Sequence, residues 1–312
     1  MPDIAMHHVF GQEVLNLLPE AIRKGITEAP YNFALFGPDP WFMYKIGTST
    51  RQGRGRRMHT TKTGAFLTGL AERAKNGTDS RNMFSYLAGF LCHYALDATT
   101  HPYIIWQTTE AWPTKRAHRD MEHGLDILLL QKEGIWGERH PVTDHHFPKV
   151  QLPESMETDL NQVYREIYGW EGARADLNRC YRRYRMLYRE MEKPRSALTV
   201  LATVVPTHRF RSVAHASSAF LDRDIEHLEH REWSQPYARD AVSRESFPEL
   251  YEKAKKLAGD MIRDAYACVY TEEMTVQALR ERLGSRSYLS GLDTEDPRNW
   301  QVRSLMPPED KG

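Results

Sequence analysis

The sequence predicts an all-α protein, folded as a multi-helical bundle. Apolar residues recur at the three- and four-residue offsets of a helix along most of the chain. No stretch of useful length alternates apolar and polar residues as a half-buried strand does, and no internal repeat indicates a solenoid. Because 312 residues can bury a sizeable core, we expect one domain made of two helical halves.

Residues 1–133 are expected to form a helical core. Its third helix is apolar on nearly all sides, which is typical of a central buried helix, and Pro102 is expected to end it. Gly134 stands where the last helix of this half should stop. The pattern predicts helices over residues 11–25, 60–76, 80–99 and 114–132.

A connecting loop is expected over residues 134–153, because prolines and glycines interrupt the helical pattern there. The C-terminal helical half of the same domain then spans residues 154–284, and a polar, loose tail spans residues 285–312. Within the C-terminal half we expect a long ordered loop over 231–247 and helices over 154–168, 173–192, 197–228, 246–271 and 274–283.

The charge balance excludes one broad class of function. Lysine plus arginine and aspartate plus glutamate both number 42, so the formal net charge is zero. This argues against a protein that binds duplex nucleic acid or an anionic membrane through bulk charge. No apolar run approaches the roughly 18 residues of a membrane-spanning helix.

The N-terminus lacks the features of a signal peptide, so we expect a cytoplasmic protein. The three cysteines are widely spaced and form no paired motif. They therefore indicate small buried side chains rather than a disulfide framework.

The central helix carries ligand-type residues in the string HYALDATTHP. His93, Asp97 and His101 are spaced four residues apart, and each step turns the helix by only about 40°, so all three side chains leave one face. A single His/Asp pair at this spacing is commonly a surface ion pair. In the most apolar helix of the chain, however, unpaired burial would be costly, so these side chains need a partner.

The next predicted helix repeats this spacing with His118 and Glu122. Two antiparallel helices would bring both sets together across the core, which is how bundle metal sites are built. Neutral imidazole and carboxylate ligands suit zinc. Residues 1–133 are therefore expected to be a metal-binding core.

Two further candidates lie upstream. Asp39 stands between Pro38 and Pro40 in a stiff GPDP turn, and His59 is expected as the first residue of a helix. Taken alone, Asp39 is more readily explained as a turn or N-cap residue, and His59 as a capping group.

With His7, these motifs resemble the zinc-dependent phospholipase C family, whose relatives include the fungal single-strand nucleases. The GPDP, HxxxDxxxHP and HxxxE motifs appear in the family's order, and the resemblance is strong over residues 1–125. The C-terminal half is similar only through EHREW and the following SFPELY.

The resemblance implies up to three zinc ions in an all-helical protein that acts on phosphate esters. Asp97 would bridge to a third ion, bound also by His7 and by the amine and carbonyl of the N-terminal residue. Asp39 is also a candidate catalytic base that orients the attacking water. The implied ligands of the other two ions are Asp39, His59, His93 and Asp97 for one, and His101, His118 and Glu122 for the other.

The N-terminus departs from the family pattern, in which secreted members begin with tryptophan. This chain begins MPDIAMH, and removal of Met1 would leave Pro2 as the first residue. The secondary amine and carbonyl of Pro2 can still chelate a metal, so Pro2 is a further candidate ligand.

The basic segment TRQGRGRRMH is expected to be a flexible loop leading into His59. Its Arg54, Arg56 and Arg57 are candidates for binding the phosphate, because arginine offers planar paired donors. A solubilising flexible loop is the alternative.

The remaining histidines have structural alternatives. Three in the connecting loop, His140, His145 and His146, could reach a metal or the substrate or could simply be solvated. His230 in EHREW is the most interesting of the downstream histidines.

The predicted function is a zinc-dependent phosphoesterase of the phospholipase C type. Metal ions lower the pKa of bound water to about 7, which provides the hydroxide needed to attack a phosphodiester. The expected partner is a phosphate-ester small molecule or a phospholipid head group. A phosphodiesterase resembling the single-strand nucleases and a non-catalytic zinc-binding protein are the alternatives.

Overall fold

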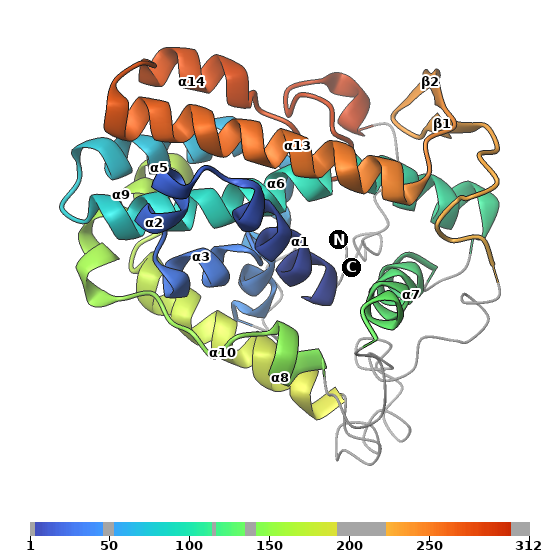
Figure 1. Ribbon diagram of the computed structural model, residues 1–312, viewed down its shortest axis with the longest axis horizontal. Coiled ribbons are helices and arrows are strands. Elements are labelled where there is room, and N and C mark those ends of the chain that lie inside the picture. Colours follow the sequence, from blue (N-terminus) through green and yellow to red (C-terminus); the bar gives the residue numbers. More distant parts are fainter. Residues whose placement is uncertain (1–3, 46–52, 114–116, 135–141, 192–222, 301–312) are drawn as a thin grey trace, which may run out of the picture.

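Helix α6 (Ser80–Trp106) is the axis of the fold (Figure 1). The structure is a computed structural model that describes residues 4–45, 53–113, 117–134, 142–191 and 223–300. The prediction of an all-α fold is confirmed. The helices with the most extensive contact to α6 are α1 (Ile4–Leu17), α3 (Glu28–Ala34), α5 (Thr63–Asn76) and α13 (Phe247–Tyr266).

Helix α6 begins where the Asp79 side chain accepts a hydrogen bond from the Asn82 backbone N–H. Its residues are buried almost continuously as far as Ile105, as its apolar sequence predicts. At Gly89 a Cβ atom would overlap the Tyr31 carbonyl, so glycine lets the backbone of α3 approach closely.

The expectation that α6 ends at Pro102 is wrong. Pro102 lies inside the helix, which continues to Trp106 and then widens into a π-helical turn, Gln107–Ala111. Proline removes one helical hydrogen bond. The residues that follow it, Tyr103 to Ile105, are buried, and their packing holds the helix beyond the break.

The first predicted helix is two helices, α1 and α2 (Glu20–Gly25), separated at Pro19. Helix α1 also starts earlier than its sequence pattern indicates, because Asp126 accepts hydrogen bonds from the backbone N–H groups of Ala5 and Met6. A carboxylate from elsewhere in the fold thus satisfies the open end of this helix.

The expected flexible basic segment is in part a helix. Residues of TRQGRGRRMH form α4 (Arg54–Thr60), which follows the short 3₁₀ helix η1 (Asp39–Met43). Lys62, with φ 56°, separates α4 from α5, so the predicted helix over 60–76 begins at Thr63.

The middle of the chain holds α7 and the helices that flank it. Helix α7 contacts α1, and the connecting loop contains a short helix, α8. The observed bounds are α7 (Ala117–Lys132), α8 (Val142–His146), η3 (Glu154–Met156), α9 (Glu157–Tyr168) and α10 (Ala173–Met191).

The C-terminal half contains a small antiparallel hairpin that the sequence pattern did not indicate. Its strands are β1 (Trp233–Gln235) and β2 (Ala238–Ser243), within the predicted long loop. The buried Trp233 anchors it, since the indole N–H donates to the Glu245 carbonyl. Most of the predicted helix over 197–228 lies outside the described residues, and residues 223–228 form turns instead of helix.

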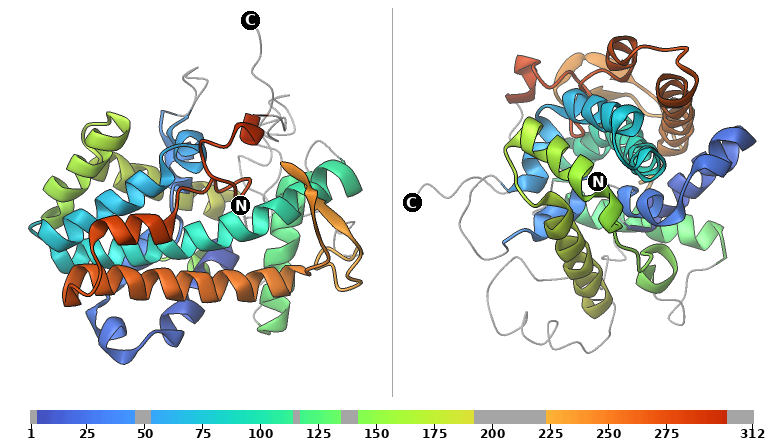
Figure 2. Two further views of the ribbon diagram at one scale, coloured as in Figure 1. Left: turned by 90° about the horizontal axis from the view of Figure 1, so that it is seen from above. Right: turned by 90° about the vertical axis from the view of Figure 1, so that its left-hand side faces the viewer.

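Helix α13 runs alongside α6, as Figure 1 and the left view of Figure 2 show. A capping box between Ser246 and Glu249 starts it. The chain continues through the π-helical turn η4 (Ala267–Thr271), α14 (Val276–Leu283) and the 3₁₀ helix η5 (Pro297–Trp300).

The loose tail expected after residue 284 is wrong for residues 285–300. Tyr288 is 1% exposed, and Ser287, Ser290 and Thr294 are buried as well. The polar side chains of this segment hydrogen-bond to the core and to one another, which explains how a polar sequence can be packed.

One hydrophobic core contains residues of both halves of the chain. All three cysteines are buried and free, as predicted. Among the residues that the structure describes, no helix is long and apolar enough to cross a membrane.

Candidate metal centre

Three groups of histidine and carboxylate side chains converge around Asp97 of α6. In each group the candidate ligand atoms lie within 4.8 Å of one another. Each group draws on residues distant in sequence. The groups are His7 with His93 and Asp97, Asp39 with His59 and His93, and His101 with His118 and Glu122.

Asp97 is the central carboxylate of the three groups. Its Oδ1 lies 3.4 Å from Nε2 of His7, and its Oδ2 lies 3.2 Å from Nε2 of His93. The same Oδ2 is 3.9 Å from Nε2 of His59 and 3.7 Å from Nδ1 of His101. Asp97 therefore faces imidazoles from α1, α4 and its own helix.

Asp39 and His59 are brought together from two short helices, η1 and α4. Asp39 is the first residue of η1, and its Oδ1 lies 3.3 Å from Nε2 of His59. The expectation that His59 begins a helix is wrong, because it lies in the last turn of α4. That position turns its ring inward, where it is fully buried.

The third group joins α6 to α7, as the repeated spacing predicted. Nε2 of His101 and Nε2 of His118 lie 3.5 Å and 2.8 Å from Oε1 of Glu122. The side chains of His118 and Glu122 are 24% and 11% exposed, against 3% or less for Asp39, His59, Asp97 and His101. Among the described residues, the centre is therefore most open at α7.

Backbone carbonyls fix the orientation of three of the imidazoles. Nδ1 of His93 lies 3.1 Å from the Leu35 carbonyl, and Nδ1 of His59 lies 2.7 Å from the Gly55 carbonyl. Nδ1 of His101 lies 2.7 Å from the Tyr288 carbonyl. A carbonyl only accepts, so each Nδ1 carries the proton and each Nε2 presents a lone pair to the centre.

The turn before Asp39 approaches His93 without a side chain. Gly37 has φ +46°, and a Cβ atom there would lie 2.5 Å from Cγ of the His93 ring. Glycine is therefore required both by the backbone conformation and by the close contact.

The donor set fits zinc. Several fully buried polar atoms make no hydrogen bond: both ring nitrogens of His7, Oδ1 of Asp39, Nε2 of His93 and His101, and both oxygens of Asp97. Leaving each without a partner costs about 1–3 kcal/mol. Ligands 2.0–2.1 Å from a tetrahedral zinc ion are about 3.4 Å apart, close to most of the N–O separations here.

The charge states also suit metal ligation. Burial alone would raise the pKa of Asp97, but the imidazoles of His93 and His101 hold it well below its usual range. Burial lowers the pKa of His7, His101 and His118. Burial would lower the pKa of His93 as well, but the neighbouring Asp97 carboxylate raises it. An ionised carboxylate with neutral imidazoles at His7, His101 and His118 is the state that binds a metal ion.

The three arginines of the basic segment differ in their contacts. Arg54 pairs with Asp176 at 3.2 Å and stacks on Tyr44, with its Cζ 3.6 Å from the ring centre. Arg57 donates to the Tyr168 carbonyl at 3.4 Å. Arg56 is half-buried and makes no ion pair with any described residue.

Other histidines lie outside the three groups. His8 and His146 pair with each other, with their Nδ1 atoms 3.4 Å apart. His145 is exposed, and His140 lies outside the described residues, as does Pro2, so the roles expected of those two are not described by the structure.

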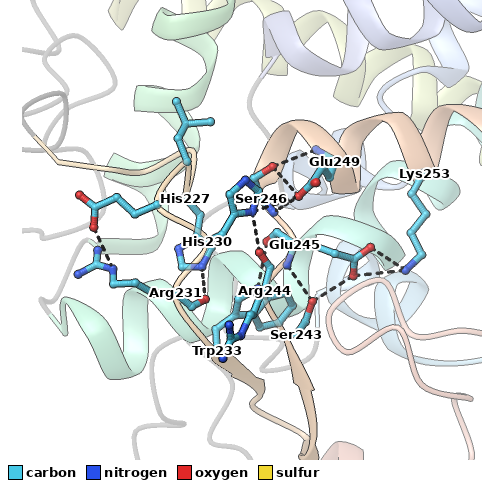
Figure 3. Close-up of polar contacts among 12 residues, drawn as sticks. His227, His230, Arg231, Trp233, Ser243, Arg244, Glu245, Ser246, Glu249 and Lys253 are labelled. Carbon is cyan, nitrogen blue, oxygen red and sulfur yellow. Dashed lines mark hydrogen bonds and ion pairs between the residues drawn. The ribbon is translucent and has the colours of Figure 1, made fainter.

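The EHREW motif has a structural role in the contacts shown in Figure 3. Nε2 of the buried His227 donates to the Arg231 carbonyl at 2.6 Å, and Nδ1 of His230 lies 3.0 Å from the Arg244 carbonyl. His230 also faces Glu249, part of the capping box of α13. Neither histidine belongs to a candidate metal group.

Three residues near the centre were missed by the sequence analysis: Gly37, Asp126 and Tyr288. Gly37 was within the quoted GPDP motif, and Asp126 continues the four-residue spacing of His118 and Glu122, so both carried a usable signal. Tyr288 contributes main-chain atoms from a polar segment, which has no signature in residue type.

The fold and these groups define a helical protein with three candidate metal groups gathered around one buried aspartate. A family model, zinc dependent phospholipase C, matches residues 6–174, and the chain belongs to this family. The matched region contains every candidate ligand from His7 to Glu122. No curated protein and no solved structure matches the chain.

Proposed function

We propose that this protein is a zinc-dependent phosphoesterase that hydrolyses a phosphodiester of the phospholipase C type with water. The observation that carries the proposal is the placement of Asp97, whose carboxylate lies within 3.9 Å of four imidazoles, and these imidazoles belong to all three candidate groups. A structural zinc site in a helical protein does not require such adjoining groups, whereas phosphoryl chemistry uses neighbouring metal ions.

Up to three zinc ions would be held by this donor set. The ligands would be Asp39, His59, His93 and Asp97 for one ion, His101, His118 and Glu122 for a second, and Asp97 with His7 for a third. Bound zinc supplies a Lewis acid for the phosphoryl oxygens and a water of lowered pKa.

Asp39 is our candidate for the base that orients the attacking water and accepts its proton, in addition to its role as a ligand. Its Oδ1 is buried, makes no hydrogen bond and points at the His59 ring. A carboxylate oxygen in this state can accept a proton or orient a water molecule.

The substrate would approach from the side of α7, where His118 and Glu122 are partly exposed. Three carboxylates, on Asp39, Asp97 and Glu122, face divalent ions, so a loaded centre carries surplus positive charge and favours an anionic phosphate. Arg56 is our candidate for a further phosphate contact, because Arg54 and Arg57 are engaged elsewhere.

The test begins with zinc content, measured by elemental analysis of the purified protein. Hydrolysis of bis(p-nitrophenyl) phosphate is then measured, with Asp97→Asn as the inactive control. Zinc-dependent turnover supports the proposal, and bound zinc without turnover across metals and pH values contradicts it in favour of a zinc-binding protein.

A second assay separates the substrate classes. Phosphatidylcholine vesicles and single-stranded DNA are offered to the same preparation. Release of phosphocholine supports the phospholipase C type, whereas cleavage of DNA alone would favour the nuclease alternative.

A further inference from the structure

The segment of residues 285–296 lies against the metal centre, although it is outside the region that the family model matches. We propose that Tyr288 is a positioning residue that holds ligands of two different metal groups through its main chain. The inference rests on the proposed ligation of zinc by His59 and His101.

The main chain of Tyr288 contacts both histidines. Its carbonyl accepts a hydrogen bond from Nδ1 of His101 at 2.7 Å, and its N–H donates to the His59 carbonyl at 2.8 Å. The first bond fixes the tautomer and the direction of the His101 lone pair. The second fixes the last turn of α4, from which the His59 ring projects.

The ring of Tyr288 fills the space behind the ligands. It is 1% exposed and meets the rings of His59 and His93 nearly edge to face, at centroid distances of 5.3 Å and 5.8 Å. It packs in the same way on Tyr94, at 5.2 Å. The ring therefore limits how far these imidazoles can tilt.

Hydrogen bonds on either side hold the segment in place. The Thr63 hydroxyl donates to the Arg286 carbonyl at 2.8 Å, and the Arg286 N–H donates to the Tyr94 hydroxyl at 2.8 Å. A turn then closes from the Gly291 N–H to the Ser287 carbonyl at 2.9 Å. The position of Tyr288 is thus determined from α5, from α6 and from within the segment.

Gly291 lets this turn rest on α6 between two of the candidate ligands. Its φ is +67°, and a Cβ atom there would lie 2.5 Å from the Ala98 carbonyl oxygen. Pro102, four residues after Ala98, has no N–H to offer that carbonyl, which leaves the helix surface open at this point. The glycine therefore rests where Pro102 leaves the Ala98 carbonyl open, at the residues that directly follow Asp97 and His101.

The test compares Gly291→Ala with Gly169→Ala. Gly169 also has positive φ, +75°, but a Cβ atom there meets nothing within 4 Å, so it controls for backbone strain. Zinc affinity is measured by competition with a chromophoric chelator, and ligand geometry by the visible spectrum of the Co²⁺-loaded protein. Gly291→Ala should bind zinc about 10- to 100-fold more weakly, as loss of such supporting contacts does elsewhere, and alter the Co²⁺ spectrum.

A second pair of variants guards against misfolding of Gly291→Ala. Tyr288→Phe keeps the ring and should retain wild-type zinc affinity, whereas Tyr288→Ala should lose affinity in the same range. If Gly291→Ala and Tyr288→Ala lower the melting temperature but leave zinc affinity and the Co²⁺ spectrum unchanged, Tyr288 is merely structural and the proposal is overturned.

Because this test measures zinc affinity and the Co²⁺ spectrum instead of hydrolysis, its outcome is separate from that of the proposed function. A wild-type protein that binds zinc but hydrolyses no phosphodiester contradicts the function and leaves the affinity comparison fully informative. A wild-type protein that binds no zinc overturns both.

Discussion

Gly37 lies directly beneath the ring of His93, so close that a Cβ atom at position 37 would be 2.5 Å from Cγ of the imidazole. The glycine also has φ +46°, which side-chain-bearing residues rarely adopt. The turn that carries Asp39 into the centre therefore depends on the absence of a side chain two residues earlier.

Substitution Gly37→Ala should displace either the turn or the His93 ring. We expect it to lower the free energy of unfolding by about 2 kcal/mol or more through strain and overpacking, and to reduce zinc content. Urea unfolding and elemental analysis measure the two effects. Gly172→Ala, at φ +62° with nothing within 4 Å of its Cβ position, should lose some stability but keep its zinc.

Substitution Asp97→Ala or His93→Ala should remove zinc from the groups that share these residues. Because zinc binds the folded state, the wild type should gain about 4 kcal/mol at free zinc a thousandfold above Kd, and the variants should lose most of this. Melting in zinc and in chelator measures the difference. A variant with full zinc content and unchanged melting would refute the site.

Substitution Asp126→Asn should loosen the first turn of α1, just before His7. The change replaces one acceptor with an amide NH₂ group that faces the N–H groups of Ala5 and Met6, at a cost of about 2 kcal/mol. We expect lower stability together with weaker binding of one zinc equivalent, measured by titration.

The matched control is Asp159→Asn. Asp159 is also buried and also accepts a backbone N–H, from Thr78 at 2.7 Å, but Thr78 does not neighbour a candidate ligand in the chain as Met6 does. It should lose stability and retain every zinc equivalent. Equal zinc affinity in both variants would show that Asp126 has no influence on His7.

The pair of His8 and His146 predicts sensitivity to acid. Burial, with His146 beside it, lowers the pKa of His8 to about 4, and burial, with His145 beside it, lowers the pKa of His146 to about 4. Between pH 6.5 and pH 4 the unfolded chain therefore binds more protons than the folded one. Stability should fall as the pH drops through this window and level off below it.

Urea unfolding of zinc-free protein at pH 7 and pH 5 measures this loss. The double variant His8→Asn/His146→Asn should lose less stability over the same interval, since the other histidines titrate in both proteins. An equal loss in both would show that the pair does not contribute.

Much of the candidate metal centre could be predicted from the sequence because several of its residues recur at the spacing of a helix. His93, Asp97 and His101, and then His118 and Glu122, recur every four residues, and a helix places such residues on one face whatever surrounds it. The pairing of these two sets across the α6–α7 contact appears in the structure as expected.

The contacts that orient the centre could not be predicted in this way. The carbonyls of Leu35, Gly55 and Tyr288 accept from the candidate ligand histidines, but every residue has a carbonyl, so no residue type reveals the partner. The segment after residue 284 is polar, and its main-chain contacts leave no mark on residue type, so the sequence predicts a loose tail there.

The sequence by itself determined the helical class of this protein and the identity of its candidate ligands, because periodicity and side-chain chemistry are local properties. Only the tertiary structure decided that Asp97 faces imidazoles from α1, α4 and α6, that the centre is most open at α7, and that Tyr288 joins His59 to His101. These depend on which distant backbones approach one another, and that is set by packing around α6 rather than by any stretch of sequence.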